Sequence, residues 1–252
     1  MRRVRIAFII CAIILSAQIV GPAPVECVPE EAEAIMAEAR ELMREGDASG
    51  ALSKVERAAA VAPHWPLPHA SLGVLNQLRG RDDLAREHYT QVQLISLLRE
   101  GAEDTALTRD IAEGEALMVY LVNLERTQRG LRLLRPHADL AIVARGHSRE
   151  MRDLGFFGHL SPRRQNRRPS DRFHNLFNHA PRAIGENLAR MSSSSHPVFT
   201  REKLRDSHER LMSSERHRRT ILWDVPDHIG VGIAVNSAGD FWITESFSVL
   251  QR

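Results

Sequence analysis

The stretch "HIGVGIAVNSAGDFWITESF", residues 228–247, joins two apolar segments through a short polar one. In both "HIGVGIAV" and "DFWITESF" apolar residues alternate or run together, as they do in strands that are buried on one or both sides. The intervening "NSAGD" has the composition of a hairpin turn. The sequence therefore predicts at least one antiparallel pair of strands near the C-terminus, with helices before it.

Two amphipathic helices are predicted ahead of this hairpin. The first covers residues 111–130 and ends at Gly130, a residue that suits the left-handed conformation of a helix C-terminus. In the second, over residues 138–154, apolar residues recur at spacings of four and three, and Gly155 follows it. His147 lies on this apolar stripe. We therefore expect it to be a core histidine bonded to a neighbour rather than a catalytic one.

Two later segments are more polar. Residues 161–183 are rich in arginine and predict an ordered surface loop or a pair of short turns. Their arginines could meet an anionic surface, although a solvated loop is the favoured interpretation. A third helix is predicted over residues 200–216.

Three polar residues stand beside turn or apolar residues instead of on a solvated face. They are His159 in "GFFGHLSP" (155–162), Glu186 in "IGENLA" (184–189) and His217 in "SSERHRRTIL" (213–222). We expect Phe156 and Phe157 to hold the turn that carries His159 against the core. His159, Glu186 and His217 are the candidates for a polar site.

The usual hydrolase motifs are absent. "HERLM" at 208–212 has Met212 where a zinc protease would have its second histidine, and "HSREM" at 147–151 lacks the last histidine of the reversed motif. The chain also has no G-x-S-x-G elbow and no phosphate-binding glycine loop. The sequence therefore gives no motif that would identify an enzyme.

The N-terminal part repeats itself at an offset of 34 residues. The matched positions are Ala39 with Gly73, Gly46 with Gly80, Ala51 with Ala85 and Val55 with Tyr89. Each copy has the pattern of a helix, a turn with glycine and a second helix, which resembles the tetratricopeptide repeat. Residues 32–99 then form two repeats of an all-α helical domain, although Asn76 and Leu97 depart from the repeat pattern.

Two repeats are fewer than the three or more that usually form a stable array. We expect this pair to pack on the helix from about Ala102 onward or on the following domain. The repeats form either a groove for a protein or peptide partner or a helical spacer, and nothing in them marks a ligand.

The first residues resemble an export signal. Residues 1–17 combine a basic start, an apolar run and an acceptable cleavage site after Ala17. The run is shorter than the roughly 20 residues of a membrane-spanning helix. We therefore expect a secreted or periplasmic protein that does not span the membrane after cleavage.

Removal of the signal changes both charge and cysteine content. Its three arginines take the formal charge from +2 to 2 − 3 = −1, so no nucleic acid partner is expected. Cys11 leaves with the signal and only Cys27 remains, which excludes an internal disulfide.

Several segments together resemble the bacterial branch of the CAP superfamily, also called SCP-like domains. The matching residues are Asn123, Arg126, Gly130-Leu131, Met151, "GFFGHLSP", Asp171-Arg172, "GENLA", "SSERHRRTIL", "IGVGIAV" and "FWITESF". The resemblance covers about residues 112–250. It implies an α+β fold: a three-layer α-β-α sandwich with an antiparallel central sheet and a cleft that contains His159, Glu186 and His217.

The resemblance also implies possible metal binding. Family members of the animal and plant type carry two histidines and two glutamates in the cleft, and some bind a divalent metal through the histidines. Here His159 and His217 would hold a metal such as zinc. The second glutamate has no clear equivalent: Ser214 stands near its place, and Glu245 sits where a glutamine is usual.

The chemistry of this cleft stays open at this point. Two imidazoles supply fewer ligands than the three or four of a zinc site. Glu186 would be either a third ligand or, preferably, an acceptor that orients one imidazole. In a metal-free cleft, a carboxylate between two histidines would raise their pKa values, and the site would bind an anion or a polar headgroup.

We favour a binding role over catalysis. A small ligand or lipid would occupy the cleft and a protein partner the repeats. The alternatives are a secreted metal-dependent hydrolase, with Glu186 or Glu245 as base, and a purely structural interaction module.

Overall fold

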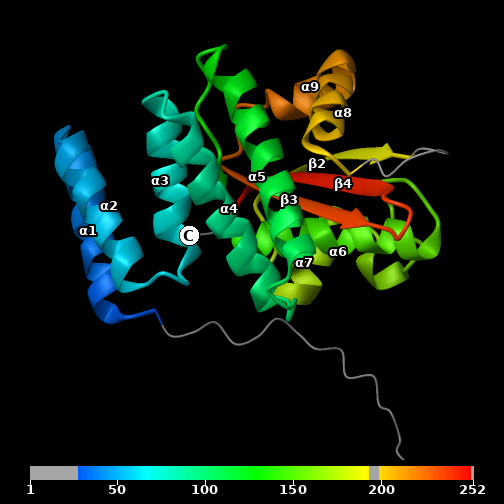
Figure 1. The fold of residues 1–252 in the computed structure, drawn as a ribbon, viewed down its shortest axis with the longest axis horizontal. Coiled ribbons are helices and arrows are strands. Elements are labelled where there is room, and N and C mark those ends of the chain that lie inside the picture. Colours follow the sequence, from blue (N-terminus) through cyan, green and yellow to red (C-terminus); the bar gives the residue numbers. More distant parts are fainter. Residues whose placement is uncertain (1–27, 193–198, 251–252) are drawn as a thin grey trace, which may run out of the picture.

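The computed structural model describes residues 28–192 and 199–250 (Figure 1). The predicted signal at 1–17 and Cys27 lie outside the described residues. Within them, four helices come first: α1 (Glu30–Glu45), α2 (Ala48–Val61), α3 (Pro66–Leu78) and α4 (Asp82–Arg99). None of the helices described is long and apolar enough to cross a membrane.

The helices of the N-terminal part meet through small residues. Ala39, Ala51 and Ala85 are almost completely buried. At Gly73, an added Cβ would lie only 2.3 Å from the ring of Tyr89, so α3 and α4 approach as closely as a glycine allows. The region is helical, as predicted, with turns at the expected glycines. Its assignment to the tetratricopeptide family stays a prediction.

The last N-terminal helices pack on the next one, α5 (Ala106–Thr127). The Tyr89 hydroxyl donates to Gln77 Oε1 at 2.9 Å and accepts from Asn123 Nδ2 of α5 at 3.1 Å. Gln77 Nε2 in turn donates to the carbonyl of Tyr120 at 3.1 Å. Ala85 and Tyr89 belong to the same apolar core as the buried face of α5. Of the four N-terminal helices, α3 and α4 therefore pack on α5, the helix that the sequence suggested as a cover for this region.

The C-terminal part is built around one sheet in the order β1-β3-β4-β2. Its strands are β1 (Arg135–Pro136), β2 (Ala183–Met191), β3 (His228–Val235) and β4 (Phe241–Val249). The predicted hairpin is β3 and β4, with Gly239 at φ 82° in its turn.

The prediction of an antiparallel sheet is wrong at one edge. β2, β4 and β3 are antiparallel, but the two-residue β1 pairs with the start of β3 in parallel. β1 continues directly into a helix, α6 (Ala138–Leu154), which runs back over the sheet. The result is a mixed sheet.

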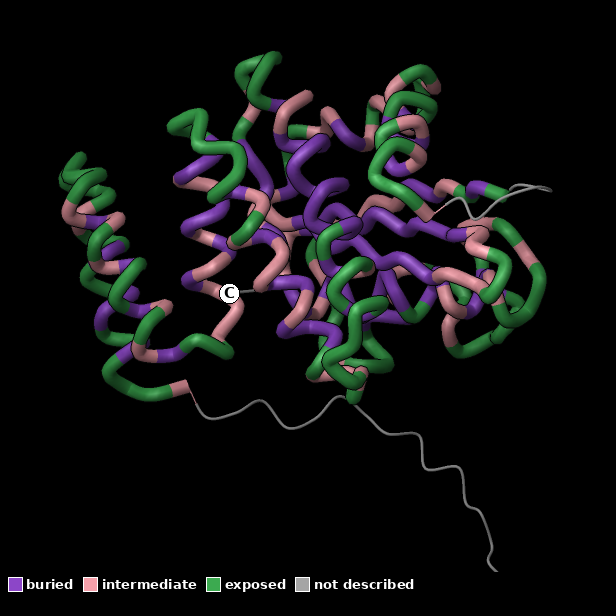
Figure 2. Tube along the Cα trace, viewed as in Figure 1, coloured by how far each residue is buried: buried purple, intermediate pink, exposed green. Residues whose placement is uncertain are grey.

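Helices cover both faces of the sheet, and buried residues gather between them (Figure 2). On one face, α6 lies against the glycines of β3, since an added Cβ at Gly230 or Gly232 would lie within 2.5 Å of its backbone. On the other face, Val231 and Ile233 pack with α5 in the main apolar core. The alternation within "HIGVGIAV" thus reflects two different neighbours.

Local structure differs from prediction in two places. Residues 161–183 contain a nine-residue helix, α7 (Pro169–Phe177), with a 3-10 turn at Arg164–Asn166 before it. Pro169 begins this helix, and Asp171 caps it by accepting from the backbone N–H of Arg168 at 3.0 Å. The predicted helix at 200–216 is two helices, α8 (Arg201–Ser213) and α9 (Glu215–Ile221), because Ser214 has an extended conformation.

A buried ion-pair cluster joins the two halves of the chain. Glu115 of α5 accepts hydrogen bonds from Arg145 Nε at 2.9 Å and from Arg145 Nη2 at 2.6 Å. Arg145 also donates to Ser96 Oγ of α4 at 3.0 Å and pairs with Glu100. Glu115 Oε1 also accepts a hydrogen bond from the backbone N–H of Ile233 at 2.9 Å. This N–H on β3, beyond the short β1, therefore has a hydrogen-bond partner. The N-terminal helices are thereby tied to the sheet domain.

Candidate functional site

Glu186 of β2 is the centre of the polar site. Its side chain is 3% exposed, and its two oxygens have different partners. Oε1 accepts a hydrogen bond from His159 Nδ1 at 3.0 Å, and Oε2 accepts one from Arg172 Nη2 at 2.5 Å. The carboxylate is therefore paired with a cation and orients an imidazole, which agrees with the orienting role that we favoured from the sequence.

Arg172 of α7 is the residue that sequence reasoning did not place in the site. Its side chain is 4% exposed. Besides Glu186, it contacts the carbonyls of His159 at 3.2 Å and Asn166 at 3.3 Å through Nη1. One guanidinium thus holds both the acidic partner and the loop of His159. The signal that could have revealed it is the "RPSD" helix start, which places Arg172 in the first turn of a helix.

His147 supports the same loop from α6. It is fully buried, and its Nε2 donates to the carbonyl of Gly158 at 3.0 Å. The same nitrogen is 3.9 Å from Glu186 Oε1. Burial lowers the pKa of His147 despite this carboxylate. The prediction of a core histidine bonded to a neighbour is confirmed.

The two phenylalanines of "GFFGHLSP" differ in burial. Phe156 packs against a small core of Met151, Leu188 and Trp242. Phe157 is 51% exposed, so the expectation that both rings are held against the core is wrong for it. The reason is that Gly155, at φ 68°, ends α6 and turns the chain, so consecutive side chains point in different directions.

His159 faces an open pocket of about 710 Å³. The lining residues are Phe156, Phe157, Gly158, His159, Leu160, Pro169, Glu186, Arg216 and Thr220. Since a carboxylate can only accept, the proton of a neutral His159 ring is on Nδ1. Its other nitrogen, Nε2, then carries a lone pair and has no hydrogen-bond partner among the described residues.

His217 lies on α9, whose position is fixed from two sides. Arg126 of α5 donates to the carbonyls of Ile221 at 2.8 Å and Trp223 at 2.7 Å. Asn187 of β2 donates to the carbonyl of His217 at 3.1 Å. These bonds hold the helix end against the sheet.

The expected rise in histidine pKa is wrong for His217. Its pKa is lowered, first by burial and then by the charges of His159 and Arg216. His217 is therefore neutral at pH 7.

Glu245 and Ser214 do not join this site. In the β2–β4 register Glu186 is opposite Ser246, while Glu245 is opposite Asn187. Glu245 therefore faces the other side of the sheet, where it accepts from Asn187 Nδ2 at 3.3 Å. The described hydrogen bonds of Ser214 are all made by its backbone, and none joins its hydroxyl to a histidine.

The residues do not fit a complete zinc site. Both oxygens of Glu186 are engaged, which leaves only the two imidazoles. In the described ranges 28–192 and 199–250, no group of three or more His, Cys, Asp or Glu side chains could hold a metal ion. The same engagement leaves Glu186 unsuited to act as a general base.

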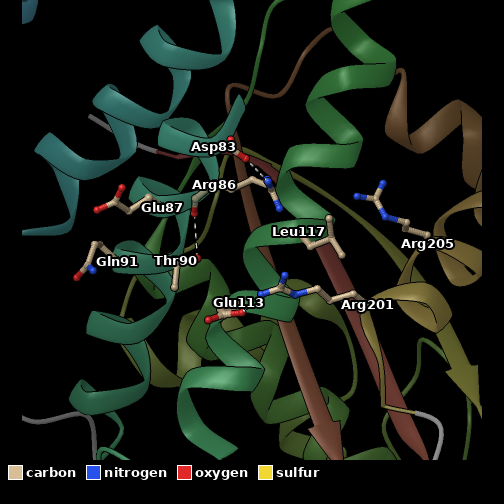
Figure 3. Close-up of a pocket in the computed structure, with 9 residues that line it drawn as sticks. All are labelled: Asp83, Arg86, Glu87, Thr90, Gln91, Glu113, Leu117, Arg201 and Arg205. Atoms are coloured by element: carbon tan, nitrogen blue, oxygen red, sulfur yellow. Dashed lines mark hydrogen bonds and ion pairs between the residues drawn. The ribbon is translucent and has the colours of Figure 1, made fainter. Parts of the chain in front are cut away.

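A second pocket, of about 370 Å³, lies where α4, α5 and α8 meet (Figure 3). Arg86 pairs with Asp83 on the same helix, α4, and Arg201 of α8 pairs with Glu113 of α5. The three arginines and three acidic residues of the pocket balance in charge. The charged side chains that line this junction therefore sum to zero formal charge.

A family model confirms what the site and fold suggest. The model described as CAP, the cysteine-rich secretory protein family, matches residues 119–248. The chain belongs to the CAP family. The matched part runs from the middle of α5 to the end of β4 and contains His159, Glu186, Arg172 and His217.

A protein with a similar sequence is the uncharacterized protein YkwD of Bacillus subtilis (strain 168). It is 31% identical over 143 residues, which are 57% of this chain and 50% of YkwD. The chain thus spans about half the length of this curated relative.

Two solved structures are also similar to this CAP protein. An outer surface protein from Borrelia burgdorferi is 15% identical at a TM-score of 0.47, over 55% of this chain and 94% of that one. An extracellular protein containing a SCP domain from Bacillus anthracis str. Ames is 24% identical at a TM-score of 0.47, over 62% and 49%.

Proposed function

We propose that this CAP protein acts outside the cytoplasm and binds a small amphiphile in the pocket at His159. The observation that carries the proposal is the fixed imidazole: Glu186 accepts from His159 Nδ1, and the ring of His159 lines the pocket. A ligand hydroxyl could donate to His159 Nε2, and Arg216, which also lines the pocket, could bind an anionic oxygen.

The rim of the pocket suits an apolar body. Phe157 is 51% and Leu160 is 54% exposed, and both line the pocket. Apolar side chains around a few placed polar groups are typical of small-molecule sites. A molecule with a hydroxylated or anionic head and an apolar chain would satisfy both parts.

The site supports binding better than catalysis. Each oxygen of Glu186 already has a partner, and Glu245 faces the other side of the sheet. The export of the chain rests on the predicted signal at 1–17. A protein partner at the N-terminal helices remains a further proposal.

The test measures binding of a fatty acid and of a lysophospholipid by calorimetry to wild type, His159→Ala and His174→Ala. His174 is an exposed histidine of α7 and serves as the matched control. We expect a loss of at least about tenfold in affinity for His159→Ala, since about 1.4 kcal/mol corresponds to tenfold, and no change for His174→Ala. Equal binding by all three proteins, or binding of neither ligand, would contradict the proposal.

Zinc titration of wild type and His217→Ala tests the metal alternative. We expect lipid binding to be the same in the presence of a chelator. Loss of lipid binding on chelation, restored by zinc, would replace the proposal with a metal-dependent site.

A further inference from the structure

A loop rich in arginine lies at the opening of the His159 pocket. This arginine loop comprises residues 161–168. Leu160, just before it, and Pro169, just after it, both line the pocket. The backbone N–H of Ser161 donates to the carbonyl of Arg167 at 3.0 Å and closes the loop. The arginine loop therefore begins and ends at the rim of the pocket.

The backbone of the arginine loop is held by α7. Asn175 Nδ2 donates to the carbonyl of Gln165 at 2.5 Å, and Arg172 Nη1 donates to that of Asn166 at 3.3 Å. Both bonds engage the main chain of the loop. Its own arginine side chains are therefore not needed to hold it in place.

The charges of the arginine loop are poorly balanced. Its four arginines are all exposed: Arg163, Arg164, Arg167 and Arg168. Arg163 pairs with Glu150 at 3.4 Å. Arg164 and Arg167 have no side-chain partner within the part of the chain that the structure describes. Residues 154–186 together carry six arginines and two acidic residues, a formal charge of 6 − 2 = +4. Positive charge is thus concentrated beside the pocket.

Arginines on other surfaces of the molecule are more often paired. Arg44 of α1 pairs with Glu41 one turn away, and Arg219 of α9 pairs with Glu215. The arginine loop has no such acidic neighbours at helical spacing. Its unpaired side chains are available to an anionic partner.

The rim of the pocket adds apolar side chains to this charge. Phe157 and Leu160 are exposed and line the pocket, as does the exposed Arg216 of α9. Arginines attract anionic headgroups, and exposed Phe and Leu enter the boundary between headgroups and acyl chains. A soluble polyanion would use only the arginines. The combination therefore favours a lipid surface.

We propose that the arginine loop and the exposed rim residues Phe157 and Leu160 dock this protein on an anionic lipid bilayer. The inference rests on the proposed function, because the bilayer would be the source of the amphiphile that the pocket binds. The attraction extends over only about 10 Å at 0.1 M salt, so the loop must come close to the surface. Docking would then place the opening of the pocket against the headgroups, and an amphiphile could enter without crossing water.

The experiment measures binding of the mature chain, residues 18–252, to vesicles by sedimentation. One set of vesicles is phosphatidylcholine, and the other is an equal mixture with phosphatidylglycerol. We expect binding to the mixed vesicles only, and weaker binding as salt rises from about 0.1 M to about 1 M.

Two double variants with the same change in charge test the loop. Arg164→Glu/Arg167→Glu should weaken partitioning onto mixed vesicles by at least about tenfold. The matched control is Arg40→Glu/Arg81→Glu, at exposed arginines of the N-terminal helices, and it should change partitioning by less than about twofold. Equal binding to both kinds of vesicle, or an equal loss in both variants, would overturn the proposal.

A third variant separates a bilayer from other polyanions. Phe157→Ser/Leu160→Ser keeps every charge and should also weaken partitioning. If it binds mixed vesicles as wild type does, the loop attracts anions in general and docking on a bilayer is overturned. Circular dichroism checks folding. If the glutamate variant does not fold, Arg164→Gln/Arg167→Gln takes its place with the same expected direction.

Lysophosphatidylcholine below its micelle concentration tests the pocket without a bilayer. Wild type and the Arg164→Glu/Arg167→Glu variant should bind it equally, because neither arginine lines the pocket. If wild type binds this lipid but no vesicles, docking is overturned and the proposed function stands. If it binds mixed vesicles but not this lipid, docking is supported and the proposed function fails.

Discussion

The two faces of the sheet hold two buried glutamates with different hydrogen-bond partners. Glu186 of β2 and Glu245 of β4 lie one position out of register on neighbouring strands. Glu186 is paired with Arg172 and faces the pocket of His159. Glu245 is fully buried, with Asn187 as its described side-chain partner, and burial raises its pKa to about 7.

The difference shows that a buried carboxylate orients a site residue only when its neighbours are arranged for that role. Glu186 accepts hydrogen bonds from both the Arg172 guanidinium and the His159 imidazole, so the carboxylate orients the ring. Without a cation, Glu245 tends to take up a proton and becomes part of the core. Strand alternation decides which residue meets which neighbour.

The largest effect on stability is expected at a third buried carboxylate, Glu115, when it loses its arginine partner. Arg145→Met leaves Glu115 buried without its arginine and should reduce the free energy of unfolding by about 3–5 kcal/mol. The matched control is Arg149→Met, because Arg149 also pairs with Glu100 but its side chain is 38% exposed. It should cost at most about 1 kcal/mol. Urea denaturation of both variants measures the difference, and equal losses would contradict the role of burial.

Glu245→Gln should stabilise the protein in a pH-dependent way. The pKa of Glu245 is about 7 in the fold against an ordinary 4.5. The folded state therefore binds this proton more tightly, and its contribution falls as pH rises from about 4.5 to 7, then stays level. At pH 8 the variant should gain up to on the order of 3 kcal/mol over wild type, and at pH 4 nothing. Denaturant titrations at several pH values test this, and a difference independent of pH would contradict it.

Arg172→Met tests the ion pair of Glu186, which lies on the face of the sheet opposite Glu245. Glu186 would lose its cation but keep its bond to His159, at the edge of an open pocket. We expect a loss of about 2–3 kcal/mol in stability, smaller than for Arg145→Met. Lipid affinity should fall as well, because the loop of His159 loses its anchor. If Arg172→Met reduced the free energy of unfolding by less than Arg149→Met does, the role of Arg172 in the site would be contradicted.

The two phenylalanines give the smallest effect on stability and separate fold from function. Phe156→Ala should cost about 1–2 kcal/mol, since the ring is only partly buried in its core. Phe157→Ala should leave the thermal midpoint nearly unchanged and weaken lipid binding, because Phe157 is exposed at the rim. The opposite pattern would show that Phe157, not Phe156, supports the loop.

Much of the fold could be predicted because it depends on local patterns. The apolar spacing of α6, the alternation of β3 and the Gly239 turn are all readable from neighbouring residues. α7 was missed because its polar, arginine-rich sequence hides a cap at Asp171. The parallel pairing of β1 was missed because two residues give no period.

Within the site, the candidates were readable but their partners were not. His159, Glu186 and His217 stood out by their odd local context. Arg172 matched the family pattern but was given no role in the site, yet its side chain is 4% exposed and contacts Glu186. Local sequence does not reveal which charge is buried against which.

The sequence alone determined the CAP membership, the helical N-terminal part and the candidate histidines, since these follow from residue types and their spacing. Only the tertiary structure decided that Glu186 orients His159, that Glu245 faces the other layer and that Arg172 pairs with Glu186. These relations depend on strand register and helix packing. Residues far apart in the chain become neighbours only when the whole core is assembled.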